Sequence, residues 1–103
     1  MSNLQKNQSR FLRLLADLII YSYEQGYELT GGDLWARDGH KNGSFHYKRL
    51  AIDLNLFRDG RYLIYTADYE PLGQYWQSLD PGCTWGGEFT NCPDGNHFSY
   101  GEK

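Results

Sequence analysis

The sequence predicts an α+β fold, with a small antiparallel sheet and two helices. Apolar residues within residues 4–25 and 66–79 recur at the three- and four-residue steps of amphipathic helices. Residues 51–57 instead alternate apolar and polar side chains, which is typical of a half-buried strand. Because a chain of 103 residues buries only about two-thirds of its unfolded surface, we expect residues 1–103 to form a single domain.

The first helix is expected from about Leu4 to Gln25. Its apolar stripe is formed by Phe11, Leu14, Leu15, Leu18, Ile19 and Tyr23. Gly26 then marks the end of the helix, because glycine readily adopts the left-handed conformation found after the last turn. A stripe at this spacing ordinarily packs on a core, so we expect this helix to be scaffold.

Short strands are expected in the middle of the chain. Residues 27–30 alternate like a strand that ends at Gly31-Gly32, and residues 51–57 form a longer alternating run. The sequence Arg58-Asp59-Gly60-Arg61 is a hairpin signal. Residues 62–65 should therefore return antiparallel to the run before them.

The second helix is expected within residues 66–79. Asp68 and Glu70 lie in its first turn, where carboxylates suit the positive end of the helix dipole. Pro71 is tolerated only near that start. Asp80-Pro81-Gly82 then ends the helix.

Two histidines and one aspartate form a candidate zinc site: His46, Asp53 and His97. Imidazoles and carboxylates are zinc ligands, and three protein ligands with one open position are typical of catalytic zinc. His46 and Asp53 stand seven residues apart, which is roughly 23 Å along a straight strand and far beyond the reach of two ligands of one ion. We therefore expect the chain to fold back within residues 47–49, so that both side chains point into one cleft.

A fourth polar residue, Asp94, precedes the third ligand. Asp94-Gly95-Asn96 is strong turn chemistry, and a four-residue turn brings its end α-carbons within about 7 Å of each other. If His97 binds the metal, the Asp94 carboxylate lies over the bound water. It can take a proton from that water and pass it to a leaving amine, which is general acid/base catalysis in metal-assisted hydrolysis.

These residues form motifs that resemble a known family. The motifs are Ser44-Phe45-His46, Asp53, Trp85-Gly86-Gly87 and Asp94-Gly95-Asn96-His97. Over most of the chain, the pattern is similar to the zinc peptidases that cut bacterial cell-wall peptides. These are the D-alanyl-D-alanine carboxypeptidases and the L-alanyl-D-glutamate endopeptidases found among phage endolysins. The resemblance implies a hedgehog/D-Ala-D-Ala peptidase-like fold.

The resemblance also implies a role for each motif residue. In that family, the residues that match His46, Asp53 and His97 bind Zn²⁺, and the residue that matches Asp94 is the catalytic base. Ligand types and spacing support the same assignment independently.

Arg37 is a candidate for substrate binding. In the resembling family an arginine at about this distance before the SxH motif holds a substrate carbonyl or carboxylate, and a guanidinium fork suits such oxygens. The family pattern could equally place its arginine at Ala36, in which case Arg37 is an ordinary solvated side chain. Two positions depart from the family pattern, with Arg49 in place of a glycine and Ser99 in place of an acidic residue.

Charge and composition limit the partners. Ten basic and thirteen acidic residues give a net charge of -3, and no Lys/Arg stripe offers the footprint that nucleic acid requires. No apolar run of about 18 residues exists, so we expect no membrane span. The start of the chain lacks the pattern of a signal peptide. We therefore expect a monomer that is cytoplasmic as synthesised and reaches the cell wall after release or permeabilisation.

The two cysteines are expected to stand outside the site. Cys83 and Cys92 are nine residues apart, which is not the CxxC spacing of metal clips and redox pairs. Reduced thiols are the expected state in a reducing compartment.

The expected function is zinc-dependent hydrolysis of peptidoglycan stem peptides. The lack of a secretion signal favours an L-alanyl-D-glutamate endopeptidase of the endolysin type, from a phage or prophage lysis system. Two alternatives stay open, a D,D-carboxypeptidase and a noncatalytic zinc-containing module that binds the wall. Asp94 favours the enzyme, because a structural site has no need of an unliganded carboxylate beside the metal.

Overall fold

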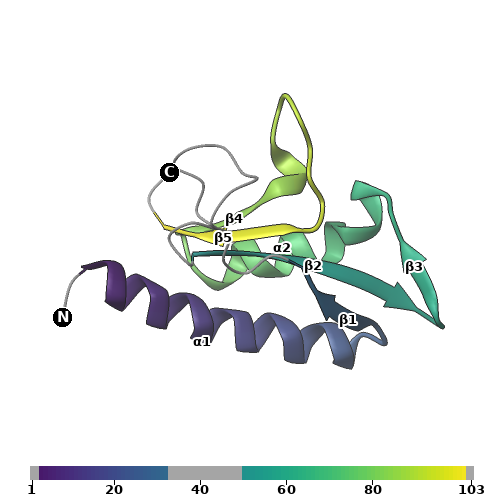
Figure 1. Cartoon of the computed structure of the whole chain (residues 1–103), viewed down its shortest axis with the longest axis horizontal. Coiled ribbons are helices and arrows are strands. Elements are labelled where there is room, and N and C mark those ends of the chain that lie inside the picture. Colours follow the sequence, from purple (N-terminus) through teal and green to yellow (C-terminus); the bar gives the residue numbers. More distant parts are fainter. Residues whose placement is uncertain (1–2, 33–49, 102–103) are drawn as a thin grey trace.

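The computed structural model describes residues 3–32 and 50–101, which form two helices and an antiparallel sheet (Figure 1). The helices are α1 (Asn3–Glu24) and α2 (Glu70–Leu79), with short 3-10 helices at Thr66–Tyr69 and Gly86–Glu88. The strands are β1 (Glu28–Gly31), β2 (Ala51–Arg58), β3 (Arg61–Leu63), β4 (Cys83–Trp85) and β5 (His97–Tyr100). The predicted α+β fold is confirmed.

The sheet is organised around β2. Its strand order is β1-β2-β5-β4, and β3 pairs with β2 outside this path. Leu56 and Phe57 pair with β1 and β3 at the same time, so these two strands flank opposite edges of β2. β3 therefore shares its edge of β2 with β5, which pairs with Ala51, Ile52 and Asp53.

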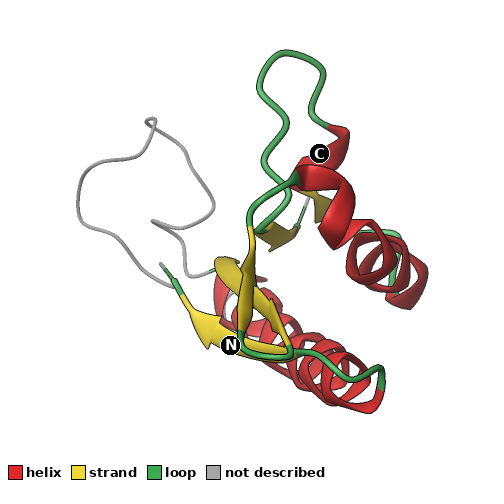
Figure 2. Cartoon of the chain, turned by 90° about the vertical axis from the view of Figure 1, so that its right-hand side faces the viewer, coloured by secondary structure: helices red, strands yellow, loops and turns green. Residues whose placement is uncertain are grey.

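One face of β2 builds the core, and the other face carries polar side chains. Ile52, Leu54 and Leu56 are buried, whereas Asp53 and Asn55 between them keep part of their surface exposed. The buried face shares one hydrophobic core with α1 and α2, and Figure 2 shows both helices beside the strands. This alternation is what a strand with one buried face requires.

Trp76 joins α2 to α1 and to the sheet. Its indole is fully buried and meets Phe11 and Phe98 edge to face, at centroid distances of 6.0 and 6.2 Å. Its Nε1 donates to the carbonyls of Thr84 (3.1 Å) and Ser99 (3.0 Å). The polar edge of the ring is therefore satisfied inside the core.

Local turn chemistry agrees with the predicted turns. Gly26, two residues beyond the end of α1, has a φ of 91°. Asp59 and Gly60 have φ values of 53° and 77° in the β2–β3 hairpin, as a two-residue type I′ turn requires.

Three predicted boundaries differ from the structure. β3 ends at Leu63, earlier than predicted, where the Tyr69 hydroxyl donates to the Leu63 carbonyl (2.9 Å) and the chain leaves the sheet. Residues 66–79 form a 3-10 helix followed by α2, because Pro71 stands in the first turn of α2 and starts a helix rather than continuing one. Gly31, expected to break the first strand, is the last residue of β1.

Both cysteines are held as thiols. Cys83 is buried at the start of β4, and Cys92 is exposed in the loop before β5. Among the described residues, neither α1 nor α2 has the length and apolar character of a helix that crosses a membrane.

Candidate metal centre

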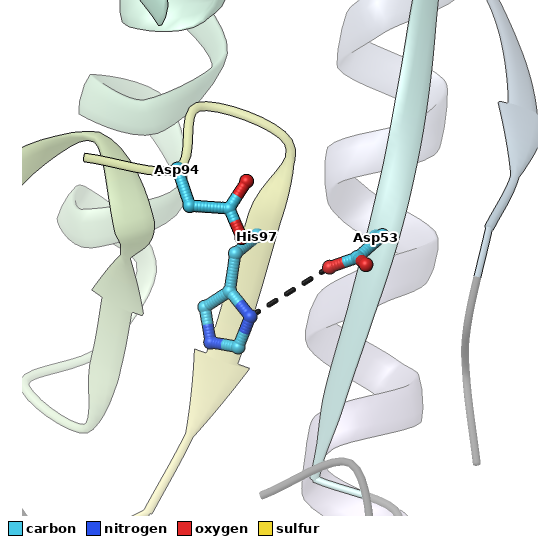
Figure 3. A group of neighbouring side chains, drawn as sticks. All are labelled: Asp53, Asp94 and His97. Carbon is cyan, nitrogen blue, oxygen red and sulfur yellow. Dashed lines mark ion pairs between the residues drawn. The ribbon is translucent and has the colours of Figure 1, made fainter. Parts of the chain in front are cut away.

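Asp53 and His97 face each other across two paired strands. Asp53 lies within β2, and His97, the first residue of β5, is its register partner. Directly opposite residues of antiparallel strands project to the same face, and Nδ1 of His97 lies 3.7 Å from Oδ1 of Asp53 (Figure 3). Both side chains are largely buried, with exposures of 13% for His97 and 20% for Asp53.

A tight turn brings Asp94 to the same place. The His97 amide donates to the Asp94 carbonyl (3.2 Å), which closes the turn that Asp-Gly-Asn predicts. One ligand atom from each of Asp53, Asp94 and His97 lies within 4.8 Å of the others, and Asp94 is the exposed member of the three. The structure therefore gathers these three predicted site residues.

Residues 85 and 86 hold the turn from one side. The Gly86 carbonyl accepts the Asp94 amide (2.9 Å), and Nε1 of Trp85 donates to the Gly95 carbonyl (2.7 Å). A Cβ on Gly86 would collide with the Asp94 carbonyl oxygen and lie 2.7 Å from Cβ of His97. Gly86 therefore allows the turn to approach closely. Trp85 is 4% exposed and belongs to the core.

The other side of the turn contacts β2 and the 3-10 helix before α2. The Leu54 amide donates to the Asn96 carbonyl (2.8 Å), and Nδ2 of Asn96 lies 3.4 Å from Oδ1 of Asn55. Gly95 is buried, and a Cβ on it would lie 2.8 Å from Cα of Thr66. The turn is thus fixed on both sides by backbone contacts.

The Asp53–His97 pair fits two ligands of one zinc ion. A hydrogen bond between these atoms would measure about 2.7–3.2 Å, and the observed 3.7 Å is longer. Zinc–nitrogen and zinc–oxygen distances are about 2.0–2.2 Å, so two ligands of one ion lie at most about 4 Å apart. Oδ1 of Asp53 is buried and turned toward His97. The donor atoms and their separation therefore suit zinc.

Two residues near the site carry no signal in the sequence motifs. The Phe89 ring packs 5.5 Å from the His97 imidazole while remaining 40% exposed. The Tyr69 hydroxyl accepts the Leu56 amide (3.1 Å) and donates to the Leu63 carbonyl (2.9 Å), so it bridges β2 and β3. Neither residue stands at a motif position, and only the folded chain shows them.

His46 and Arg37, the other two predicted site residues, lie outside the described residues. A third zinc ligand at His46 and a substrate contact at Arg37 therefore stay predictions. Ser99, where the family pattern often has an acidic residue, is buried in β5 opposite Ala51. This departure from the family pattern removes none of the three clustered side chains.

A protein-family model matches residues 38–100, a span that includes Asp53, Asp94 and His97 and also His46. This family model describes peptidases, so the cluster lies in a protein of the peptidase class. Its description is D-alanyl-D-alanine carboxypeptidase, and the match covers more than half of the chain, so the chain belongs to this family. No curated protein matches the chain. The predicted resemblance to the D-alanyl-D-alanine carboxypeptidase family is confirmed, and this family implies peptidoglycan peptides as substrates. The resemblance to endolysin endopeptidases stays a prediction.

Proposed function

We propose that the chain is a zinc-dependent peptidase that hydrolyses peptidoglycan stem peptides, with the L-alanyl-D-glutamate bond as its target. The observation that carries this proposal is the position of Asp94 beside the Asp53–His97 pair. Ligand atoms 3.7 Å apart offer a metal-binding pair, and an exposed carboxylate stands within 4.8 Å of both. Family membership supplies the reaction class, hydrolysis of a peptide bond.

The proposed ligands are His46, Asp53 and His97. On Asp53 and His97 the ligand atoms are Oδ1 and Nδ1, because these atoms face each other (Figure 3). When bound, zinc supplies a Lewis acid that lowers the pKa of water and polarises a carbonyl. The His97 ring is oriented for this role by strand pairing and by the Phe89 ring at 5.5 Å.

Asp94 is the proposed general acid/base. Its carboxylate accepts the proton of the attacking water and donates it to the nitrogen of the leaving amine. Its exposure gives water and substrate access to the carboxylate. The hydrogen bond from the Asp94 amide to the Gly86 carbonyl (2.9 Å) holds the Asp94 backbone beside the cluster. Arg37 is proposed to hold a substrate oxygen, on the family resemblance.

A D,D-carboxypeptidase is the second candidate, because the description of the matching family favours it. Such an enzyme has to bind the terminal carboxylate of its substrate close to the scissile bond, and Arg or Lys suits that task. The described residues that line the pocket beside Asp94 include Tyr62 and Thr66 but neither Lys nor Arg. The bond that is cut distinguishes this candidate from the endopeptidase.

The test is digestion of purified peptidoglycan with zinc-loaded protein, followed by identification of the new termini by mass spectrometry. A new amino terminus on D-glutamate is the expected product. Release of D-alanine alone would move the assignment to the D,D-carboxypeptidase. His97→Ala is the control, and it should lose both zinc and activity. Stoichiometric zinc without any product would instead indicate a noncatalytic wall-binding module.

A further inference from the structure

A pocket of about 230 Å³ opens beside Asp94, between the end of β3 and the turn before β5. Its lining includes Tyr62, Ile64, Thr66, Tyr69, Asp94 and Asn96. The pocket exists because the two strands on this edge of β2 leave a gap. β5 begins at the partner of Asp53, and β3 pairs only with residues 56–58.

The lining offers hydrogen-bond acceptors and negative charge. Asp94 contributes a carboxylate, Asn96 an amide, and Tyr62 and Thr66 a hydroxyl each. None of the described residues that line the pocket is Lys or Arg. The pocket is therefore suited to a group that is neutral or positively charged.

The pKa of the Tyr69 hydroxyl also reflects negative charge near the pocket. Tyr69 is buried, and burial is the main cause that raises the pKa of its hydroxyl. Tyr62 and the carboxylates of Asp68 and Asp94 raise this pKa further, because negative charge nearby disfavours the phenolate. Aromatic rings such as those of Tyr62 and Tyr69 also attract cations to their faces.

We propose that this pocket binds a primary ammonium group of the substrate, carried by a lysine-type side chain close to the scissile bond. An ammonium group has three donors and no acceptor, which matches a lining of carboxylate, hydroxyl and amide oxygens. An anionic group would meet the charge of Asp94 with like charge. Because Asp94 belongs to both the pocket and the metal cluster, the bound residue lies near the bond that is cut. The inference rests on the proposed function and deepens it by naming a substrate side chain.

The size and rim of the pocket fit a side chain. Its volume of about 230 Å³ lies below the roughly 300–1,000 Å³ of pockets for drug-sized ligands. Tyr62 and Ile64 are 49% and 66% exposed, so they can cover the alkyl stem of a lysine-type chain while its ammonium tip reaches the polar groups.

A pair of substrates tests the charge directly. Two stem peptides that differ only in acetylation of the lysine ε-amine are given to the zinc-loaded protein. Acetylation keeps the alkyl stem and removes the charge, so kcat/KM should fall by about 3–10-fold. Equal kcat/KM for the two peptides overturns the proposal.

A pair of variants locates the effect. Ile64→Lys adds a cation to the pocket lining, and Ile20→Lys adds one to α1 at a similar exposure, 66% against 58%. Ile64→Lys should lose the preference for the free amine, and Ile20→Lys should keep it. If the preference survives in Ile64→Lys, the ammonium group binds elsewhere and the pocket assignment is wrong.

Binding to zinc-free protein separates this inference from the proposed function. The same two peptides are titrated into the chelator-treated protein and followed by calorimetry. Tighter binding of the free amine, with no hydrolysis by the zinc-loaded protein, would overturn the proposed function and support the pocket. Hydrolysis of both peptides at equal rates, with equal affinity, would overturn the pocket and support the function.

Discussion

One edge of β2 has two stretches with different surroundings. Its first stretch, which ends at Asp53, pairs with β5, and its last stretch, from Leu56, pairs with β3. Asp53 and its partner His97 are largely buried, whereas Tyr62 and Ile64 beside the second stretch are 49% and 66% exposed. β2 thus carries the candidate ligand Asp53, pairs with the strand that carries His97, and borders the pocket a few residues further on.

The gap between the two stretches is closed by other groups. The Leu54 amide donates to the Asn96 carbonyl (2.8 Å), and the Leu56 amide donates to the Tyr69 hydroxyl (3.1 Å). Buried backbone donors are costly without partners, so these contacts allow β5 and β3 to separate. Several contacts fix the stretch of β2 that carries Asp53, which we call the ligand side. On the pocket side, next to β3, the Tyr69 hydroxyl bridges β2 and β3. Substitutions on the two sides should therefore act on different properties.

The largest effect is expected for Asp94→Asn, on the ligand side. Asparagine is nearly isosteric and suits the same turn, so zinc content and fold should persist. It cannot accept a proton at neutral pH, so turnover should fall by about 10²–10⁴-fold, or roughly 3–5 kcal/mol of barrier. Turnover of stem peptide and zinc content measured on one sample would show both results.

Asp53→Asn is the matched substitution within the same cluster. It removes a charged ligand and leaves the proposed base in place, so affinity for zinc should fall. Competition with a chelator measures this affinity. If Asp94→Asn cleaves stem peptide within a few-fold of the parent, another group takes the proton and the proposed mechanism is wrong.

Gly86→Ala should displace the turn formed by residues 94–97. The added Cβ would collide with the Asp94 carbonyl oxygen, and overpacking costs about 1–3 kcal/mol. We expect the upper end of that range, because contacts from Trp85 and β2 prevent the turn from yielding. Zinc affinity should fall as well.

Gly31→Ala is the control for Gly86→Ala. A Cβ on Gly31 would meet no atom within 4 Å, so the free energy of unfolding should change by less than about 0.5 kcal/mol. Urea denaturation of the zinc-free variants compares the two positions. Equal free energies of unfolding for Gly86→Ala and Gly31→Ala would show that close packing at Gly86 does not fix the turn.

Tyr69→Phe should act on stability and leave zinc binding intact. It removes the hydroxyl that accepts the Leu56 amide and donates to the Leu63 carbonyl. The free energy of unfolding should fall by about 1–2 kcal/mol. Amide hydrogen exchange at Leu56 should also become faster. Tyr62→Phe changes an exposed residue of the β2–β3 hairpin, and it should lower the free energy of unfolding by less than about 0.5 kcal/mol. Loss of zinc from Tyr69→Phe would mean that the two sides are not independent.

The smallest effect on the site is expected when both cysteines are replaced, as Cys83→Ala with Cys92→Ser. Neither residue belongs to the cluster of Asp53, Asp94 and His97, so zinc content should stay stoichiometric and turnover should stay within a few-fold. The buried position of Cys83 makes a stability loss of about 1 kcal/mol reasonable. A folded double variant without zinc would contradict the ligand assignment.

Local patterns in the sequence predicted the elements that local forces determine. The apolar stripe of α1 and the alternation of β2 reflect burial of one face. The hairpin at Asp59-Gly60 and the turn at Asp94 follow from residues that tolerate a tight turn. These signals were sufficient to place His97 directly beyond a turn and Asp53 on a strand.

Contacts between distant residues could not be predicted in this way. The need for glycine at residue 86 comes from the Asp94 turn, and the bridge made by Tyr69 comes from two strands before it. Phe89 meets His97 only because the loop between them folds back. None of these contacts leaves a period or a spacing in the sequence, so the pocket between β3 and the turn could not be predicted either.

The hydrogen bond between Trp85 and the turn makes this tryptophan an intrinsic fluorescent probe of the turn. The indole is 4% exposed, and Nε1 donates to the Gly95 carbonyl (2.7 Å), next to Asp94. It lies so close to Gly73 of α2 that a Cβ there would collide with the ring. Indole emission depends on the polarity and hydrogen bonding around the ring. A movement of the turn on binding metal or peptide would therefore change the intrinsic fluorescence, without any added label.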